Sequence, residues 1–266
     1  MSQHNEQPIR PPREARERFD VLLRPHDELL RAYVRRLIGH AADAEDLVQA
    51  TTLKAFERFA TLRDEGAFRG WLLTIATRTC LDHLRKQERW RPYSQRYLEE
   101  ECEADDERRQ QVVDATRDPG FAFDVREHVS FCFSCVGRSL VPTRAAAIVL
   151  REVVGLTNKE AANILSLSES VFRGELSKGR RAMEATFDGL CSLINKDGVC
   201  RQCASFREVM PAARRGPALP VLNDRGDPWQ ARLTLVRATP FANGISAGLH
   251  ELLFSMLKTL EAEHGP

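Results

Sequence analysis

Two C-x-x-C pairs hold the side chains of this chain that are best suited to chemistry. The first pair is Cys132 and Cys135, and the second is Cys200 and Cys203, with Cys191 nearby. Two such pairs supply the ligand number and the pairwise spacing of a tetrahedral Zn(II) site. More than sixty residues separate the pairs, however, so a thiol–disulfide switch and buried or incidental cysteines are the alternatives.

A second set of candidate residues is basic and suits contact with phosphates. Thr74, Arg78, Arg85 and Arg89 follow one another at steps of four, seven and four residues. These steps place the four side chains on one side of a predicted helix that begins near Phe68, opposite an apolar side. Arginines in this arrangement bind nucleic-acid phosphates in a sequence-independent and salt-sensitive way.

The segment before this helix predicts another helix, which the carboxylate of Asp43 would cap. Glu45 and Asp46 lie in its first turn, where the helix dipole favours anions. Apolar residues then recur at helical spacing and predict one buried face: Leu47, Ala50, Leu53, Phe56 and Phe59. Upstream, residues 14–39 predict helical structure interrupted at Pro25.

Three motifs in this order carry a family resemblance. They are DAEDLVQ from Asp43, FR-x-WL-x-x-IA from Phe68 and LDHLR from Leu81. Together they resemble the promoter-melting domain of the extracytoplasmic-function (ECF) group of bacterial RNA polymerase sigma factors. The resemblance implies that Glu45, Asp46 and Gln49 bind the polymerase core, and that residues 61–67 build a pocket for a flipped base. The DNA-contacting residues implied in this domain are Arg69, Trp71, Thr74, Arg78, Arg85 and Arg89.

Three features of this domain leave alternatives open. Trp71 could stack on an unpaired base or belong to the core. Many ECF sigma factors have Asn where this chain has Arg78, which suits guanine or phosphate instead. The acidic first turn would also stabilise its helix without any partner.

Residues 122–188 predict a helix-turn-helix unit. Thr157 and Glu160 form a capping-box pattern, and Ser168 can cap the longer helix that follows. At this distance from the first domain, the unit resembles the upstream-element-binding domain of an ECF sigma factor. The implied DNA-contacting residues are Ser168, Glu169, Ser170, Arg173, Ser177 and Lys178. Gly174 and Glu175 depart from the family pattern and predict weaker or shifted promoter recognition.

The remaining segments complete the predicted organisation. Residues 1–12 are expected to be disordered, and residues 13–92 form the first domain. Residues 93–121 are an acidic linker, either solvated or placed in the path of nascent RNA. Residues 189–266 form a cysteine-containing extension outside the resemblance, in which Asp227-Pro228 can start a helix. The extension either regulates the sigma domains or only stabilises the fold. An all-α protein of two small domains and a mostly helical extension is predicted.

Composition narrows the function classes. The 266 residues carry a formal net charge of only +1, so nucleic-acid binding must come from local patches. No apolar run reaches the length of a membrane span, and the polar start is unlike a secretory signal, so a cytoplasmic protein without membrane insertion is expected.

The predicted function is therefore that of a sigma factor, which is not an enzyme. Its predicted partners are RNA polymerase core and promoter DNA. No cofactor is required, and Zn(II) at the cysteine pairs is the one candidate. A separate anti-sigma factor is a further candidate partner. The alternative from another class is a conventional helix-turn-helix regulator that never binds polymerase core. A redox enzyme using Cys200 and Cys203 is disfavoured, because no βαβ pattern surrounds the pair.

Overall fold

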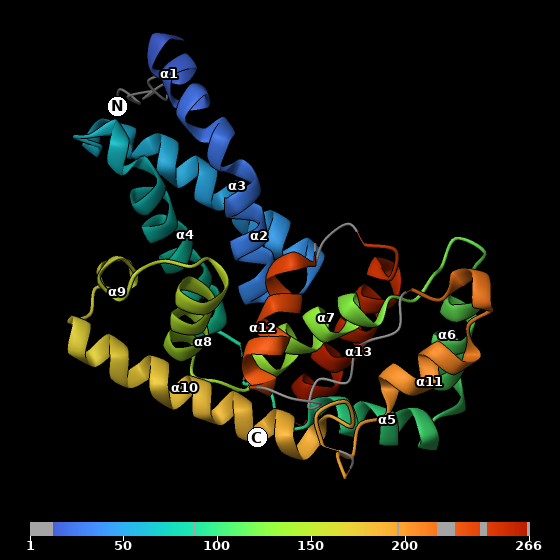
Figure 1. The fold of residues 1–266 in the computed structure, drawn as a ribbon. Coiled ribbons are helices and arrows are strands. Elements are labelled where there is room, and N and C mark those ends of the chain that lie inside the picture. Colours follow the sequence, from blue (N-terminus) through green and yellow to red (C-terminus); the bar gives the residue numbers. More distant parts are fainter. Residues whose placement is uncertain (1–12, 88, 196, 217–226, 240–243, 265–266) are drawn as a thin grey trace, which may run out of the picture.

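The computed structural model describes residues 13–87, 89–195, 197–216, 227–239 and 244–264. Within these ranges the regular elements are helices, accompanied by two isolated β bridges. The all-α fold class is thereby confirmed. Figure 1 shows the helices arranged around α7 (Val125–Gly137), which lies in the middle of the molecule. The expected disorder of residues 1–12 lies outside the described residues.

The first helical group consists of α1 (Arg13–Leu23), α2 (Asp27–Ile38), α3 (Ala41–Glu57) and α4 (Phe68–Leu84). A 3-10 turn containing Pro25 separates α1 from α2, as the sequence predicts. The hydroxyls of Tyr33 and Thr77 lie 2.8 Å apart in the buried contact between α2 and α4. Gly39 ends α2 with φ = 87°, a conformation that favours glycine.

Two expectations for α3 need correction. The helix begins at Ala41 with His40 as its cap, and the His40 ring accepts the Asp43 N–H; Asp43 therefore lies inside the first turn. Leu53 is 59% exposed rather than buried. It follows Leu47 by six residues, which places it about 120° around the helix from the buried face.

The expected acidic linker is a pair of packed helices, α5 (Ser94–Ala104) and α6 (Asp106–Arg117). Leu98 is 2% exposed and belongs to an apolar cluster with α13 (Ala247–His264). Several of the acidic side chains pair with arginines of the same hairpin, as Glu99 does with Arg96 and Glu101 with Arg108. A solvated linker is therefore wrong, because Leu98 anchors the segment. Its placement in the path of nascent RNA stays a prediction.

The second helical group confirms the two predicted helix starts, at Thr157 and Ser168. It contains α7, α8 (Pro142–Ile148), a π-helical turn (Val149–Val153), α9 (Asn158–Leu165) and α10 (Glu169–Leu190). Thr157 and Glu160 form the capping box of α9. The Ser168 hydroxyl accepts the Val171 N–H at the start of α10. The α9–α10 turn passes through Ser166 at φ = 56°.

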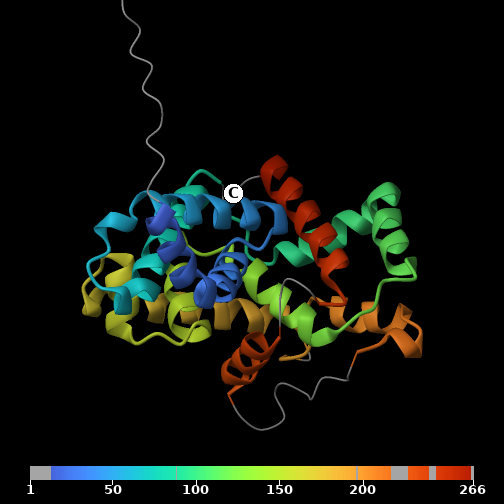
Figure 2. The same ribbon diagram turned by 90° about the horizontal axis from the view of Figure 1, so that it is seen from above.

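The C-terminal extension contributes to both apolar cores of the protein. Its helices are α11 (Gln202–Val209), α12 (Pro228–Ala238) and α13. Asp227 caps α12, as predicted. Trp229 and Leu233 of α12 join the core shared by the first and second helical groups, whereas Leu253 and Leu257 of α13 join the core under α5. Figure 2 shows α13 beside α5 and α6, away from α12.

Candidate functional site

The first candidate surface is an apolar groove between α1 and α3 with an acidic edge. Its volume is about 560 Å³. Its apolar lining consists of Phe19, Leu23, Val48, Leu53 and Phe56. The predicted polymerase-binding residues Glu45, Asp46 and Gln49 are all exposed on α3, and Gln49 also lines the groove.

Charge pairing already orders this edge. Arg31 of α2 pairs with both Asp27 and Glu45, and the Gln49 amide donates to Glu45 at 3.3 Å. The hydrogen bond to Asp27, partly offset by burial, raises the pKa of Arg31. Sequence analysis missed Leu53 as a surface residue. The signal was available, because the buried stripe of α3 continues through Thr51 and Ala55, which leaves Leu53 on the other side.

The second candidate surface is the basic side of α4. Arg69 and Arg78 are exposed on the helix, and Thr74 is half-buried with its hydroxyl donating to the Gly70 carbonyl at 2.8 Å. Arg85 and Arg89 are exposed but lie beyond the helix end at Leu84, so the predicted continuous helical face is wrong for these two.

Trp71 was expected either to stack on an unpaired base or to belong to the core, and the structure places it between these two alternatives. Trp71 is half-buried and packs on Phe68, with ring centroids 5.6 Å apart. One side of its indole is thus held by the core while part of it stays accessible. Phe68 in turn stacks on His26, at 5.7 Å.

The α4 surface faces the helix-turn-helix group. The Arg78 guanidinium donates to the Ser166 hydroxyl at 3.3 Å, and α4 packs against α9. Hydrogen bonds from Thr157 lower the pKa of Glu160, and the charge of Arg69 acts in the same direction. The structure thus brings two predicted DNA-contacting arginines next to the turn of the other domain.

The third candidate surface is the first half of α10. The six predicted contact residues are all exposed: Ser168, Glu169, Ser170, Arg173, Ser177 and Lys178. Arg173 pairs with Glu169 at 3.2 Å, and Lys178 pairs with Glu175 at 3.1 Å. Arg144 of α8 also binds Glu175, at 2.8 Å, which sequence analysis missed. These bonds from Arg144 and Lys178 lower the pKa of Glu175, so its negative charge is held beside the surface.

One cysteine from each predicted pair, Cys135 and Cys203, packs in or against the same apolar core. Cys135 belongs to the apolar core under α5, together with Trp90 and Phe131. Cys132, one turn earlier, lies instead near Cys191 and Cys200, whose thiols add to the rise in its pKa that burial causes. Among the described residues, no three Cys, His, Asp or Glu side chains form a ready-made metal site.

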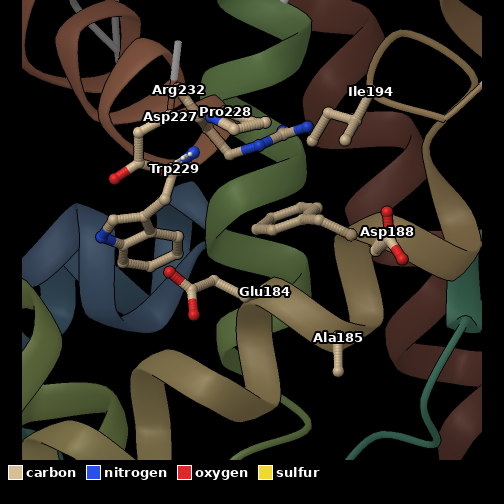
Figure 3. Close-up of a pocket in the computed structure, with 9 residues that line it drawn as sticks. Glu184, Ala185, Asp188, Ile194, Asp227, Pro228, Trp229 and Arg232 are labelled. Carbon is tan, nitrogen blue, oxygen red and sulfur yellow. Dashed lines mark hydrogen bonds between the residues drawn. The ribbon is translucent and has the colours of Figure 1, made fainter. Parts of the chain in front are cut away.

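A cavity of about 340 Å³ lies between α10 and α12 (Figure 3), and one of its lining residues, Arg232, donates to the Cys191 sulfur. Phe187, Trp229 and the carboxylates of Glu184 and Asp188 contribute to its lining. Arg232 extends from α12 along the cavity toward Ile194.

Comparison with known proteins shows which families parts of this chain resemble. Residues 22–90, which include α2 to α4, match the sigma-70 region 2 family. The chain is 29% identical over 185 residues to the ECF RNA polymerase sigma factor SigG of Mycobacterium tuberculosis, covering 65% of this chain and 50% of that protein. It is 32% identical over 164 residues to SigJ of the same species, covering 61% of this chain and 48% of that protein. The chain thus spans about half the length of these relatives.

Shorter relatives and a solved structure extend this comparison. The RNA polymerase sigma-H factor of Pseudomonas aeruginosa is 24% identical over 175 residues, covering 65% of this chain and 87% of that protein. A sigma factor RpoE from Bartonella quintana, solved in complex with the anti-sigma factor NepR, aligns with a TM-score of 0.45 and 20% identity. That alignment covers 65% of this chain and 98% of the solved chain. By its sequence matches, this chain is similar to sigma-70 region 2 over residues 22–90 and to ECF RNA polymerase sigma factors over 61–65% of its length.

No helix of the described ranges combines the length and the apolar character that a membrane span requires.

Proposed function

We propose that this protein is a sigma factor that binds RNA polymerase core, recognises two promoter elements and opens promoter DNA. The proposal rests on one observation: the residues that match sigma-70 region 2 also carry two surfaces suited to binding. The acid-edged groove of α3 and the basic side of α4 both lie within residues 22–90 or at their border with α1. The protein then acts as a non-enzymatic subunit in the cytoplasm, where polymerase works.

The groove suits an amphipathic helix with basic flanks. Exposed apolar side chains such as Leu53 would supply contact area, and the carboxylates of Glu45 and Asp46 would pair with cations at the rim. Rim charges mainly guide association, whereas the apolar groove supplies most of the affinity. A helix on the polymerase core is the partner that this combination favours.

The basic side of α4 and the start of α10 would contact different parts of the promoter DNA. Exposed cations at Arg78, Arg85 and Arg89 would grip phosphates, and the accessible part of Trp71 would support an unpaired base. The start of α10 would enter the major groove, with Ser170 and Arg173 near base edges. Glu175 repels phosphates, which supports the expectation of weak binding by this domain.

Promoter binding requires the two groups to move apart. In the described arrangement Arg78 donates to Ser166, and α4 packs on α9. DNA cannot reach the α4 surface along this contact until α9 withdraws. We therefore assign the described arrangement to a closed form of the sigma factor, which polymerase binding at α3 would help to open.

Pull-down of core polymerase tests the proposal and separates it from a conventional helix-turn-helix regulator. Asp46→Lys should reduce co-purification with core at least tenfold, because it places a cation where cations of the partner are expected. Glu103→Lys on α5 is the matched control, since Glu103 is equally exposed but lies outside residues 22–90. Unchanged core binding by Asp46→Lys, or no core binding by the unaltered protein, would reject the proposal.

A further inference from the structure

The loop between α10 and α11 folds back so that Cys191 and Cys200 lie side by side. The two residues form an isolated bridge, in which the Cys200 N–H donates to the Leu190 carbonyl at 2.8 Å. Gly198 makes the close return possible, because a Cβ at this position would lie 2.5 Å from the Cys191 carbonyl carbon. The fold therefore holds two cysteines together that are nine positions apart in the sequence.

Two further cysteines join this pair. Cys203 lies on α11, which packs against α7, where Cys132 is located. Burial raises the pKa of the Cys203 thiol well above its ordinary value, and the thiols of Cys132, Cys191 and Cys200 add to this rise. Each of the three is thus an electrostatic neighbour of Cys203. Of these thiols only Cys132 adds to the rise in the pKa of Cys135 that burial causes, and the charge of Arg138 opposes that rise.

A buried arginine contacts the Cys191 thiol, and its charge also acts on Cys132 and Cys203. Arg232 is 1% exposed, and its guanidinium donates to the Cys191 sulfur at 3.3 Å. It also lies over the Phe187 ring, 3.7 Å from the centroid. Its buried Nε has no hydrogen-bond partner within the described residues. A buried cation is stabilised by nearby negative charge, which neutral thiols do not supply. The carboxylates of Glu184 and Asp188 line the same cavity as Arg232.

We propose that Cys132, Cys191, Cys200 and Cys203 bind one Zn(II) ion as four thiolates, with Arg232 as the neighbouring countercharge. Metal binding releases the thiol protons and leaves a site with a net charge of −2, which Arg232 partly balances. Four sulfur ligands favour zinc among the common divalent ions. The ligand set differs from the two C-x-x-C pairs, because Cys191 replaces Cys135.

Closing a coordination shell around the ion requires the four cysteine side chains to rotate. In the described residues the side chains do not yet form one, but a cysteine sulfur moves between staggered χ1 positions without backbone change. The described residues around Cys191 and Cys200 are held by their isolated bridge and by the bond that the Gly198 N–H donates to the Asn195 carbonyl at 2.8 Å. A bound ion would tie α7, the end of α10 and α11 together.

Metal analysis of cysteine variants of the full chain tests this assignment, independently of any transcription assay. The unaltered protein should hold about one zinc per chain by elemental analysis. Its Co(II)-loaded form should show thiolate charge-transfer absorption and the visible bands of a tetrahedral site. Cys191→Ser should lose at least nine-tenths of the zinc, whereas the matched variant Cys135→Ser should keep it, because only Cys191 lies in the proposed ligand set.

Two measurements keep the test decisive if a variant unfolds. Zinc should leave the unaltered protein on treatment with a strong chelator and return in equimolar amount afterwards. Arg232→Gln should retain zinc stoichiometry but bind it about 10–100-fold more weakly in competition with a chromophoric chelator. Zinc-free unaltered protein that also fails to bind added zinc, or loss of metal from Cys135→Ser with retention in Cys191→Ser, would overturn the proposal.

Discussion

The groove on α3 and the C-terminal extension use apolar residues in opposite ways. Leu53 of α3 is 59% exposed in a groove that no other part of the described chain covers, whereas Leu253 of α13 is 2% exposed. The family match includes the first region and excludes the second. Leu253, outside the family match, therefore matters more for folding than Leu53. Leu53, inside the match, matters more for partner binding.

The two regions nevertheless meet at the beginning of α3. Glu251 of α13 accepts the Ala41 N–H, with oxygens 3.0 and 3.1 Å away, and it lies 3.0 Å from His40. Lys258 pairs with Asp43 at 2.7 Å. The extension thus supports the helix that carries the proposed polymerase surface, one turn before Asp46. Gly39 fits under Phe254 of the same helix, where a Cβ would clash.

The largest expected effect is the loss of stability on truncating Leu253, compared with truncating Leu53. Leu253→Ala should lower the free energy of unfolding by about 2–5 kcal/mol, because it leaves a cavity in the core under α5. Leu53→Ala should change it by less than about 0.5 kcal/mol but weaken core polymerase binding. Urea unfolding and core pull-down of both variants check this. Equal destabilisation by the two substitutions would contradict the comparison.

Two buried histidines should make the stability of the core around α13 depend on pH, which is not expected of the groove on α3. His128 of α7 and His250 of α13 lie in contact, with ring nitrogens 3.3 Å apart. Burial lowers the pKa of His128 to about 4, and burial together with the charges of His128 and Arg35 lowers that of His250 well below its ordinary value. Both histidines must therefore stay neutral for the core to remain folded.

The sign of the pH effect follows from these directions. Between about pH 6.5 and pH 4 the unfolded chain binds more protons than the folded chain, so stability falls as the pH is lowered through this window. The loss at pH 4 should be on the order of 1–3 kcal/mol, and these histidines should contribute no slope above about pH 7. Urea midpoints from pH 4 to 8 measure it. His128→Gln should flatten the slope; an unchanged slope in this variant would assign it elsewhere.

A substitution on the basic side of α4 should affect promoter opening without affecting polymerase binding. Arg78→Ala should lower open-complex formation at a cognate promoter about tenfold or more, because a charge-assisted contact contributes about 1.5–3 kcal/mol. It should leave core binding unchanged, unlike substitution of Asp46. Arg117→Ala on α6 is the control, since Arg117 is exposed outside the matched region. Fluorescence of a base analogue in the melted segment reports the outcome. Full melting by Arg78→Ala would remove Arg78 from the mechanism.

The smallest expected effect comes from the ion pair that joins the two regions. Lys258→Ala should lower the free energy of unfolding by less than about 1 kcal/mol, because the Lys258 side chain is 43% exposed and the pair is screened by salt. Urea midpoints at low and high ionic strength measure this. A loss above about 2 kcal/mol would mean that this contact, rather than apolar burial, holds α13 on α3.

Local chemistry made much of this fold predictable. Thr157 with Glu160, Ser168 and Asp227 each satisfy backbone N–H groups within three residues, so the starts of α9, α10 and α12 were predicted from the sequence alone. The motif from Phe68 likewise predicted the start of α4 and its buried side. The exposed positions of Asp46, Arg78 and Arg173 also followed from helical spacing, because a surface face needs no distant partner.

Contacts between distant segments decided the rest. Leu98 is buried only because α13 packs on it, so the acidic composition of residues 93–121 predicted a linker where the chain forms two packed helices. Cys191 joins Cys132 and Cys203 because the chain turns back at Gly198 and α11 packs on α7. Sequence spacing paired Cys132 with Cys135, but one helical turn separates them into different environments. Capping depends on neighbours along the chain, whereas the partner of a buried side chain depends on how whole helices pack.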